Sequence, residues 1–166
     1  MLTTRYKPLF ALTVSLLTFL LIFVASVLPA GAAPPEPICF DLVAILGGAP
    51  GSWSSSGLVT SGGTAIFDPF VAGWDPELGI PATVHHEDVL TDEHGSITYR
   101  AQAKSALVTD DDGDPVPGYH VNWVIISGTG AYATLRGQGD GYGWPDFASG
   151  TFPAYLCGQA HFHPHK

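Results

Sequence analysis

Apolar and polar side chains alternate with a period of two along most of the chain beyond residue 37. The clearest run covers residues 96–108. Its apolar positions are Ile97, Tyr99, Ala101, Ala103 and Leu107, and its polar positions are Thr98, Arg100, Gln102 and Lys104. Such alternation is typical of a β-strand that buries one face and exposes the other. This segment is therefore predicted to be a strand whose apolar face contributes to a core.

Similar short runs, separated by clusters of Gly, Pro and Asp, predict further strands. They cover residues 38–46, 53–60, 64–70, 83–91, 119–126, 148–152 and 154–162. No stretch in this part of the sequence has a sustained helical period, and at most one helical turn is expected, near residues 132–135. About eight short strands, with turns roughly every 8–12 residues, predict an all-β domain. An antiparallel barrel of about eight strands is favoured, and a β-sandwich is the alternative.

The first 32 residues differ in composition from the rest. Arg5 and Lys7 precede a dense apolar run over residues 9–28, and the small residues Ala30-Gly31-Ala32 follow it. This order is typical of a secretory signal peptide, so cleavage is expected after Ala32. An uncleaved anchor is the alternative, since about 20 apolar residues are enough to span a bilayer. Either way the domain is expected outside the cytoplasm, and after cleavage as a secreted protein without membrane contact.

The remainder divides into a short linker and one domain. The Pro-rich residues 33–37 are expected to form the linker, and residues 38–166 a single β domain. Beyond residue 32 the chain carries all 15 acidic residues but only four basic ones, a formal net charge of −11. This field repels phosphate backbones and anionic lipid surfaces, so nucleic-acid binding is not expected. The apolar content is high enough to exclude a disordered chain.

The two cysteines, Cys39 and Cys157, lie near the two ends of the predicted domain. An even pair in an oxidising compartment usually forms a disulfide, and two free thiols are the alternative. A bond between them closes a loop of about 120 residues, worth about 4–5 kcal/mol in the chain-entropy treatment. The bond also joins the first strand to the last, which favours a barrel because its first and last strands lie side by side.

The segment 128–139, G-T-G-A-Y-A-T-L-R-G-Q-G, is the most distinctive in the chain. Gly128 and Gly130 permit a tight turn with positive φ, and Tyr132 and Leu135 are expected to turn inward and plug a barrel end. The segment resembles the G-T-G-x-[FY]-A-x-x-x-G-x-G stretch of the allene oxide cyclase and dirigent-like barrel proteins, most of all their small secreted bacterial members. The similarity extends over about residues 83–162.

This resemblance implies the barrel fold of that family. Its plant members catalyse a cyclisation or steer radical coupling inside the barrel, so an enzyme of this type acting in the lumen is one functional hypothesis. Their catalytic residues cannot be matched to positions in this sequence, and fold alone does not imply function. No catalytic residue is therefore assigned.

Several polar side chains are candidates for acid–base chemistry inside a barrel. They are Glu87, Asp88, Tyr99, Arg100, Lys104 and His120. Arg100 and Lys104 lie on the polar face of the strand at 96–108, near His120 if that strand pairs with the one at 119–126. If this face lines the lumen, it forms a polar pocket. If it faces solvent, as the apolar character of the opposite face favours, it is an ordinary exterior.

Aromatic residues supply the leading functional hypothesis. Trp53, Trp74, Trp123, Trp144, Tyr99 and Tyr132 either line a pocket for an apolar or sugar ligand or pack in the core. We expect a secreted barrel that binds a small hydrophobic or aromatic ligand, or that serves in the envelope without chemistry. Its candidate binding residues are Tyr99, Arg100, His120, Trp123 and Tyr132. The sequence contains neither a phosphate loop nor a G-x-S-x-G elbow, and no cofactor is expected.

A metal-binding structural or adhesion module is the third hypothesis. Asp110, Asp112 and Asp114 suit Ca²⁺ chemically, but their spacing to Gly113 does not fit an EF-hand, and a solvated hairpin turn is the alternative. His161, His163 and His165 alternate at the C-terminus, where Pro164 interrupts the strand, and His85, His86 and His94 lie elsewhere in the sequence. No metal site is assigned from either set.

Overall fold

The structure is a computed structural model that describes residues 34–164, so the predicted signal peptide or anchor lies outside the described residues. In this range nine strands form one antiparallel sheet, accompanied by a short 3₁₀ turn, η1. The elements are β1 (Glu36–Ile45), β2 (Gly51–Gly57), β3 (Ser61–Ile66), β4 (Pro69–Ala72), β5 (Thr83–Asp92), β6 (Gly95–Thr109), β7 (Pro115–Gly128), η1 (Gly130–Tyr132), β8 (Leu135–Gly143) and β9 (Thr151–Phe162). The all-β prediction is confirmed.

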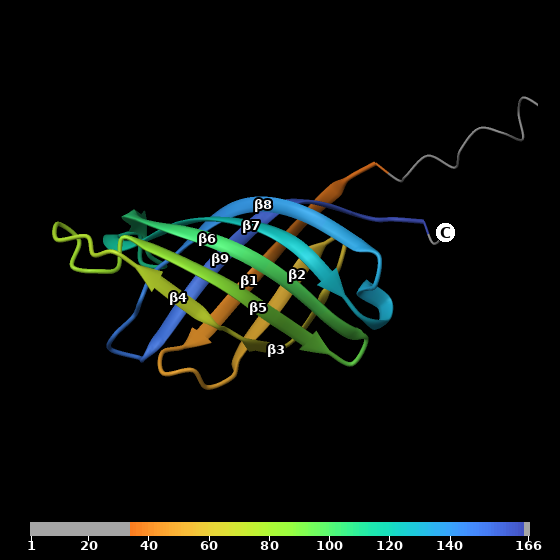
Figure 1. Cartoon of the computed structure of the whole chain (residues 1–166), viewed down its shortest axis with the longest axis horizontal. Helices are drawn as coiled ribbons and strands as arrows, with labels where there is room; N and C mark the ends of the chain where they lie inside the picture. The colour runs from red at the N-terminus through yellow and green to blue at the C-terminus, as the bar shows by residue number, and fades with distance from the viewer. Residues whose placement is uncertain (1–33, 165–166) are drawn as a thin grey trace, which may run out of the picture. The chain divides into compact units, whose positions relative to one another are not determined.

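The sheet closes into a ring (Figure 1). Its strands follow the order β3-β2-β1-β9-β8-β7-β6-β5, and a further pairing of β3 with β5 completes the circuit. The remaining strand, β4, pairs with residues 83–86 of β5, whereas β3 pairs with residues 89–91. β3 and β4 therefore follow one another along the same edge of β5. The predicted barrel is confirmed.

The first and last strands lie side by side, as predicted. Cys39 of β1 lies directly opposite Cys157 of β9, and the two form a disulfide. Strand β1 also begins earlier than expected, because Glu36 and Pro37, which the sequence assigned to a linker, already pair with β9. The ring itself closes elsewhere, at the β3–β5 seam, which has only three residue pairs.

Further element boundaries differ from the prediction. The strand expected at 64–70 is divided into β3, which begins at Ser61, and β4. The two strands expected at 148–152 and 154–162 are one strand, β9, and the glycine-rich residues 135–143 form β8. Glycine has low strand propensity, so its density concealed β8 from a reading based on apolar alternation.

The alternation of β6 is confirmed up to residue 104 and wrong beyond it. Leu107, expected in the core, is 61% exposed, whereas Val108 is buried. β5 begins at Thr83, opposite Lys104, so the last residues of β6 have no partner strand on that edge. Val108 lies on the outer face of the sheet. There its side chain and that of Trp144 both lie close to Gly118. The position of the neighbouring strand, rather than the pattern of β6, decides which of these side chains is buried.

One end of the barrel is plugged by η1 and the start of β8 (Figure 1). Tyr132 and Leu135 are both buried there, as predicted from the distinctive segment. Gly130 has a φ of +56°, which fits the expected tight turn. Gly128 does not have a positive φ, and its role is close packing, since a Cβ atom there would lie 2.2 Å from the carbonyl oxygen of Tyr132.

The opposite end of the barrel is open. The connections from β1 to β2, β4 to β5, β6 to β7 and β8 to β9 gather there (Figure 1). In residues 34–164 no helix is long and apolar enough to cross a membrane.

Candidate functional site

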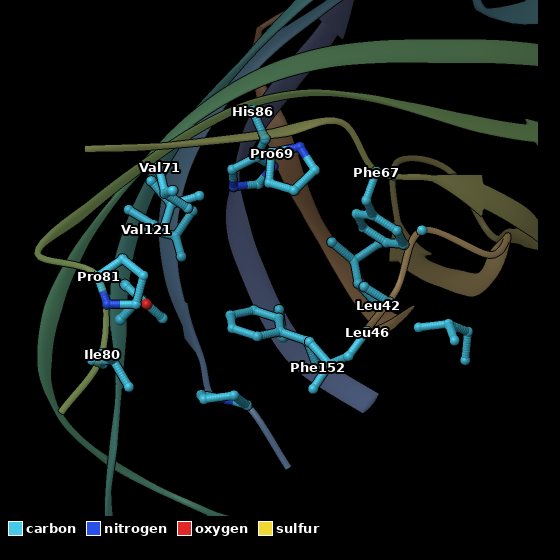
Figure 2. A pocket seen from close by; sticks show the side chains of 18 of the residues that line it. Leu42, Leu46, Phe67, Pro69, Val71, Ile80, Pro81, His86, Val121 and Phe152 are labelled. Carbon is cyan, nitrogen blue, oxygen red and sulfur yellow. The ribbon is translucent and has the colours of Figure 1, made fainter. Parts of the chain in front are cut away.

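The open end of the barrel holds a cavity of about 300 Å³. Its wall consists of inward side chains from β1, β5, β6, β7 and β9 and of loop residues around the mouth. Almost all of this wall is apolar, and Leu42, Phe67, Val121 and Phe152 point into the space in Figure 2. The volume lies at the lower end of the roughly 300–1,000 Å³ typical of small-molecule sites.

Two loops of similar construction lie beside the mouth. In residues 75–80 the Asp75 carboxylate accepts from the N–H groups of Glu77 and Leu78, and in residues 146–151 the Asp146 carboxylate accepts from those of Ala148 and Ser149. Hydrogen bonds, first of all from the Ser105 and Ser149 hydroxyls, lower the pKa of Asp75 and of Asp146. Both carboxylates are thus committed to holding the loops in shape.

The mouth also carries exposed apolar side chains. Val71 of β4 and Phe147 of the β8–β9 loop line the cavity and are 55% and 76% exposed. Together with Leu46, they give the entrance an apolar rim that continues into the apolar wall. Exposed apolar surface of this kind often marks a binding site.

A cluster of polar side chains at the wall comes from β5 and β6. On β5 the inward positions are Val84, His86, Asp88 and Leu90. His86 lines the cavity and points into it in Figure 2, and Asp88 behind it is fully buried. Tyr99 of β6 lies directly opposite Asp88 in the strand register and is also buried.

These three side chains form a compact group. His86 Nδ1 is hydrogen-bonded to Asp88 Oδ2. The His86 ring meets the Tyr99 ring edge-on, with ring centroids 6.2 Å apart and an interplanar angle of 79°. The second carboxylate oxygen, Asp88 Oδ1, and the Tyr99 hydroxyl have no hydrogen-bond partner in the described part of the chain.

Burial makes the Tyr99 hydroxyl harder to ionise. It raises the pKa of the Tyr99 hydroxyl well above its ordinary value, and the negative charge of Asp88 raises this pKa further. Tyr99 is therefore a neutral phenol at any ordinary pH. Its hydroxyl is close enough to Asp88 that a hydrogen-bonding interaction with the carboxylate also raises this pKa, although the two side chains lie outside regular hydrogen-bond geometry.

A buried polar atom without a partner costs roughly 1–3 kcal/mol, and native proteins keep few of them. Two such atoms lie here within one group, beside a cavity. An ionised Asp88 can only accept, so His86 Nδ1 donates to it and, in the neutral imidazole, Nε2 is left as an acceptor. The group can thus orient an imidazole toward a molecule in the cavity, which makes it the candidate functional site.

The six polar candidates separate between the two faces of the sheet. Asp88 and Tyr99 face inward, whereas Glu87, Arg100, Lys104 and His120 are exposed on the outside. Arg100 and Glu87 form a cross-strand ion pair there, with Arg100 Nη2 3.2 Å from Glu87 Oε2. The period of two puts neighbours in sequence on opposite faces, so the structure does not bring this set together.

Of the five candidate ligand-binding residues, Tyr99 lines the cavity and the other four do not. Trp123 is buried in the core against Phe40, with ring centroids 5.5 Å apart, and Tyr132 belongs to the plugged end. Arg100 and His120 lie on the outer surface. Trp53 and Trp144 are buried away from the cavity, and Trp74 is exposed.

His86 was missed as a cavity residue by sequence reasoning, which grouped it with His85 as an imidazole for metal binding. A signal was present, since Val84, His86, Asp88 and Leu90 repeat with a period of two. The polar outward residues of this strand, His85 and Glu87, masked it, because the segment looks polar on both faces.

The acidic loop between β6 and β7 forms a turn. Asp110 Oδ1 accepts from the backbone N–H groups of Asp112 and Asp114, at 3.0 and 2.9 Å. Within residues 34–164 no three His, Cys, Asp or Glu side chains gather to hold a metal ion. His161 and His163 do lie together, with their Nε2 atoms 3.2 Å apart, and His165 is outside the described range.

Comparison of the chain with protein-family models, with curated proteins and with solved structures found no match. The resemblance to allene oxide cyclase and dirigent-like proteins therefore stays a prediction. Function has to be inferred from the geometry of the cavity itself.

Proposed function

We propose that this protein is a secreted barrel that binds a small, largely apolar molecule in the cavity at its open end. The observation that carries the proposal is a cavity of about 300 Å³ whose wall is apolar except for His86, Tyr99 and Tyr119. A cavity with a few polar groups in an apolar wall is the usual form of a small-molecule site.

The rings and aliphatic side chains of the wall favour a flat, compact ligand. Phe152 packs against Tyr119, with ring centroids 5.9 Å apart, and both line the cavity. Each CH₂ group that such a ligand buries contributes about 0.8 kcal/mol. The apolar rim offers the same kind of contact to an entering molecule.

Secretion is part of this proposal. The Cys39–Cys157 disulfide supports it, because such bonds persist mainly in oxidising compartments, and the first 32 residues have the composition of a signal peptide. N-terminal sequencing of protein from the culture medium should begin at Ala33. Recovery of the intact chain from the membrane fraction would instead support the anchor.

Binding is tested by isothermal titration calorimetry with naphthalene, which fits a cavity of this size and makes no hydrogen bonds. We expect saturable binding, and a loss of at least about tenfold in affinity in Ala103→Leu, which fills part of the cavity. Gln102→Leu is the matched control, because residue 102 is exposed on the outer face of the same strand. An absence of saturable heat with the wild-type protein would contradict the proposal.

A second candidate function, proton transfer on a bound molecule, is favoured by the His86–Asp88 pair. A histidine held by a buried carboxylate beside a cavity is a suitable general base. The resemblance to enzymes that act inside a barrel points the same way. Deuterium exchange of the α-protons of 2-tetralone, followed by NMR, should then be faster with the wild type than with His86→Gln. Equal rates would remove this function.

A further inference from the structure

The hydrogen-bonding direction of His86 is set by what lies behind it. Asp88 is fully buried, and among the described residues His86 is its one hydrogen-bond partner. If the ring moved its proton from Nδ1 to Nε2, Asp88 would lose that bond and keep a buried charge without any donor. Such a loss is costly, because a buried ionised group needs hydrogen bonds. The neutral ring is therefore held as the Nδ1–H tautomer.

The nitrogen that this tautomer presents to the cavity is an acceptor. Nδ1 is engaged by Asp88, so Nε2 is the nitrogen left for a ligand, and it carries a lone pair in the neutral ring. Figure 2 shows the His86 ring directed into the cavity from β5, with apolar side chains around it. An N–H or O–H group brought to this position finds a partner, whereas an ether or carbonyl oxygen faces a lone pair.

Tyr99 does not offset this preference. Tyr99 and Tyr119 are the other polar side chains in the wall. Tyr99 is only 1% exposed, and its hydroxyl proton is attracted toward the Asp88 charge rather than toward the cavity. A ligand acceptor would have to compete with that charge for the proton. The group on β5 and β6 thus offers the His86 acceptor to the ligand and directs the Tyr99 donor away from it.

We infer that His86 meets the ligand as a neutral imidazole beside an ionised Asp88, and that the cavity therefore selects small planar molecules that carry one N–H or O–H donor, which hydrogen-bonds to His86 Nε2. This inference rests on the proposed function and adds the chemistry of the ligand to it. His86 is then the specificity-determining residue, and Asp88 is a positioning residue that acts through the imidazole tautomer.

The test compares indole with benzofuran by calorimetry on the purified secreted protein at neutral pH. The two have nearly the same shape, but indole has an N–H donor where benzofuran has an acceptor oxygen. We expect indole to bind about tenfold more tightly, as a buried hydrogen bond to an otherwise unpaired acceptor would give. Binding of both with equal affinity would overturn the inference while leaving the proposed function intact. Binding of neither would contradict both.

Variants separate the roles of the three side chains. His86→Phe should bring the indole-to-benzofuran ratio close to one, and Asp88→Asn should lower it several-fold, because the ring can then adopt either tautomer. His85→Gln, on the outer face of the same strand, is the matched control and should keep the ratio. The assignment would be overturned if His86→Phe left the indole-to-benzofuran ratio unchanged, or if Tyr99→Phe abolished the preference. Either result would show that a group other than His86 hydrogen-bonds the ligand.

Discussion

Each end of the barrel contains a carboxylate on the inner face of β5, and the two carboxylates differ in their hydrogen bonding. Asp92 lies at the plugged end and Asp88 lies four residues earlier, behind the cavity. Each has a tyrosine close by, Tyr132 for Asp92 and Tyr99 for Asp88. The difference lies in how many of the carboxylate lone pairs are used.

At the plugged end both oxygens of Asp92 are occupied. Oδ2 accepts from the hydroxyls of Ser61 and Tyr132, and Oδ1 accepts from the N–H groups of His94 and Gly95 at 2.7 and 3.0 Å. Although burial raises the pKa of Asp92, these hydrogen bonds outweigh it and hold the pKa below its ordinary value. Asp92 thereby ties η1, β3 and the β5–β6 turn together.

Behind the cavity Asp88 has one partner, His86, and its second oxygen has none among the described residues. The comparison teaches that a buried acid is not in itself a functional residue. The hydrogen bonds of Asp92 all stabilise the fold, whereas the group around Asp88 leaves His86 Nε2 for a hydrogen bond with a molecule in the cavity. Four experiments test this distinction.

Removal of the Asp92 carboxylate should have the largest effect. Asp92→Ala leaves the Tyr132 hydroxyl and two backbone N–H groups without their acceptor, so we expect a loss of about 3 kcal/mol in the free energy of unfolding. Urea denaturation followed by tryptophan fluorescence measures it. A loss below about 1 kcal/mol would mean that water replaces the carboxylate and that the plugged end does not depend on it.

Replacing both members of the other pair should act in the opposite direction. The double variant His86→Leu/Asp88→Val removes a buried charge together with its partner, so we expect a gain of about 1 kcal/mol in stability. The same variant should lose the preference for indole over benzofuran. A double variant clearly less stable than the wild type would place Asp88 with Asp92, as part of the scaffold.

The two tyrosines allow a smaller, matched test. Tyr132→Phe removes a hydrogen bond of 2.5 Å to a charged acceptor and should cost about 1.5 kcal/mol. Tyr99→Phe removes a buried hydroxyl without a regular hydrogen-bond partner, so it should cost no stability and should raise it slightly. Comparison of the two urea midpoints checks this, and equal losses would contradict it.

The smallest effect is a dependence on pH. Because the folded state lowers the pKa of Asp92, its ionisation stabilises the fold above about pH 4, the unfolded value, and this contribution is lost as the pH falls through the folded pKa. The stability difference between wild type and Asp92→Asn should therefore shrink as the pH is lowered below about 4. A difference that is constant over this range would show that the charge of Asp92 is not what matters.

Much of the barrel could be predicted from local pattern. The period-two alternation located most strands, the turn segment placed Tyr132 and Leu135 inward, and the cysteines near the two ends proved to be neighbours. Each of these features depends on residues nearby in the sequence or, for the disulfide, on the fact that two cysteines can pair in only one way. The exposure of Leu107 could not be predicted from local pattern, because it depends on where the neighbouring strand β5 begins.

The candidate site was only half predicted, for a related reason. Asp88 and Tyr99 were among the candidates, but so were Arg100 and His120, which lie on the outer face. In β5 polar residues occur on both faces, so hydrophobic contrast could not tell His86 from His85. Only the strand register determines which of the two imidazoles shares a wall with Tyr99.

By itself, the sequence determined the fold class, the approximate strand positions, the pairing of Cys39 with Cys157 and the plug at one barrel end. Alternation and turn chemistry are local properties, and two cysteines allow a single disulfide. The tertiary structure alone decided that the opposite end stays open, that His86 faces inward and that Asp88 keeps an unpaired oxygen. A cavity and an unsatisfied atom depend on what the other strands fail to fill, and no local pattern records that.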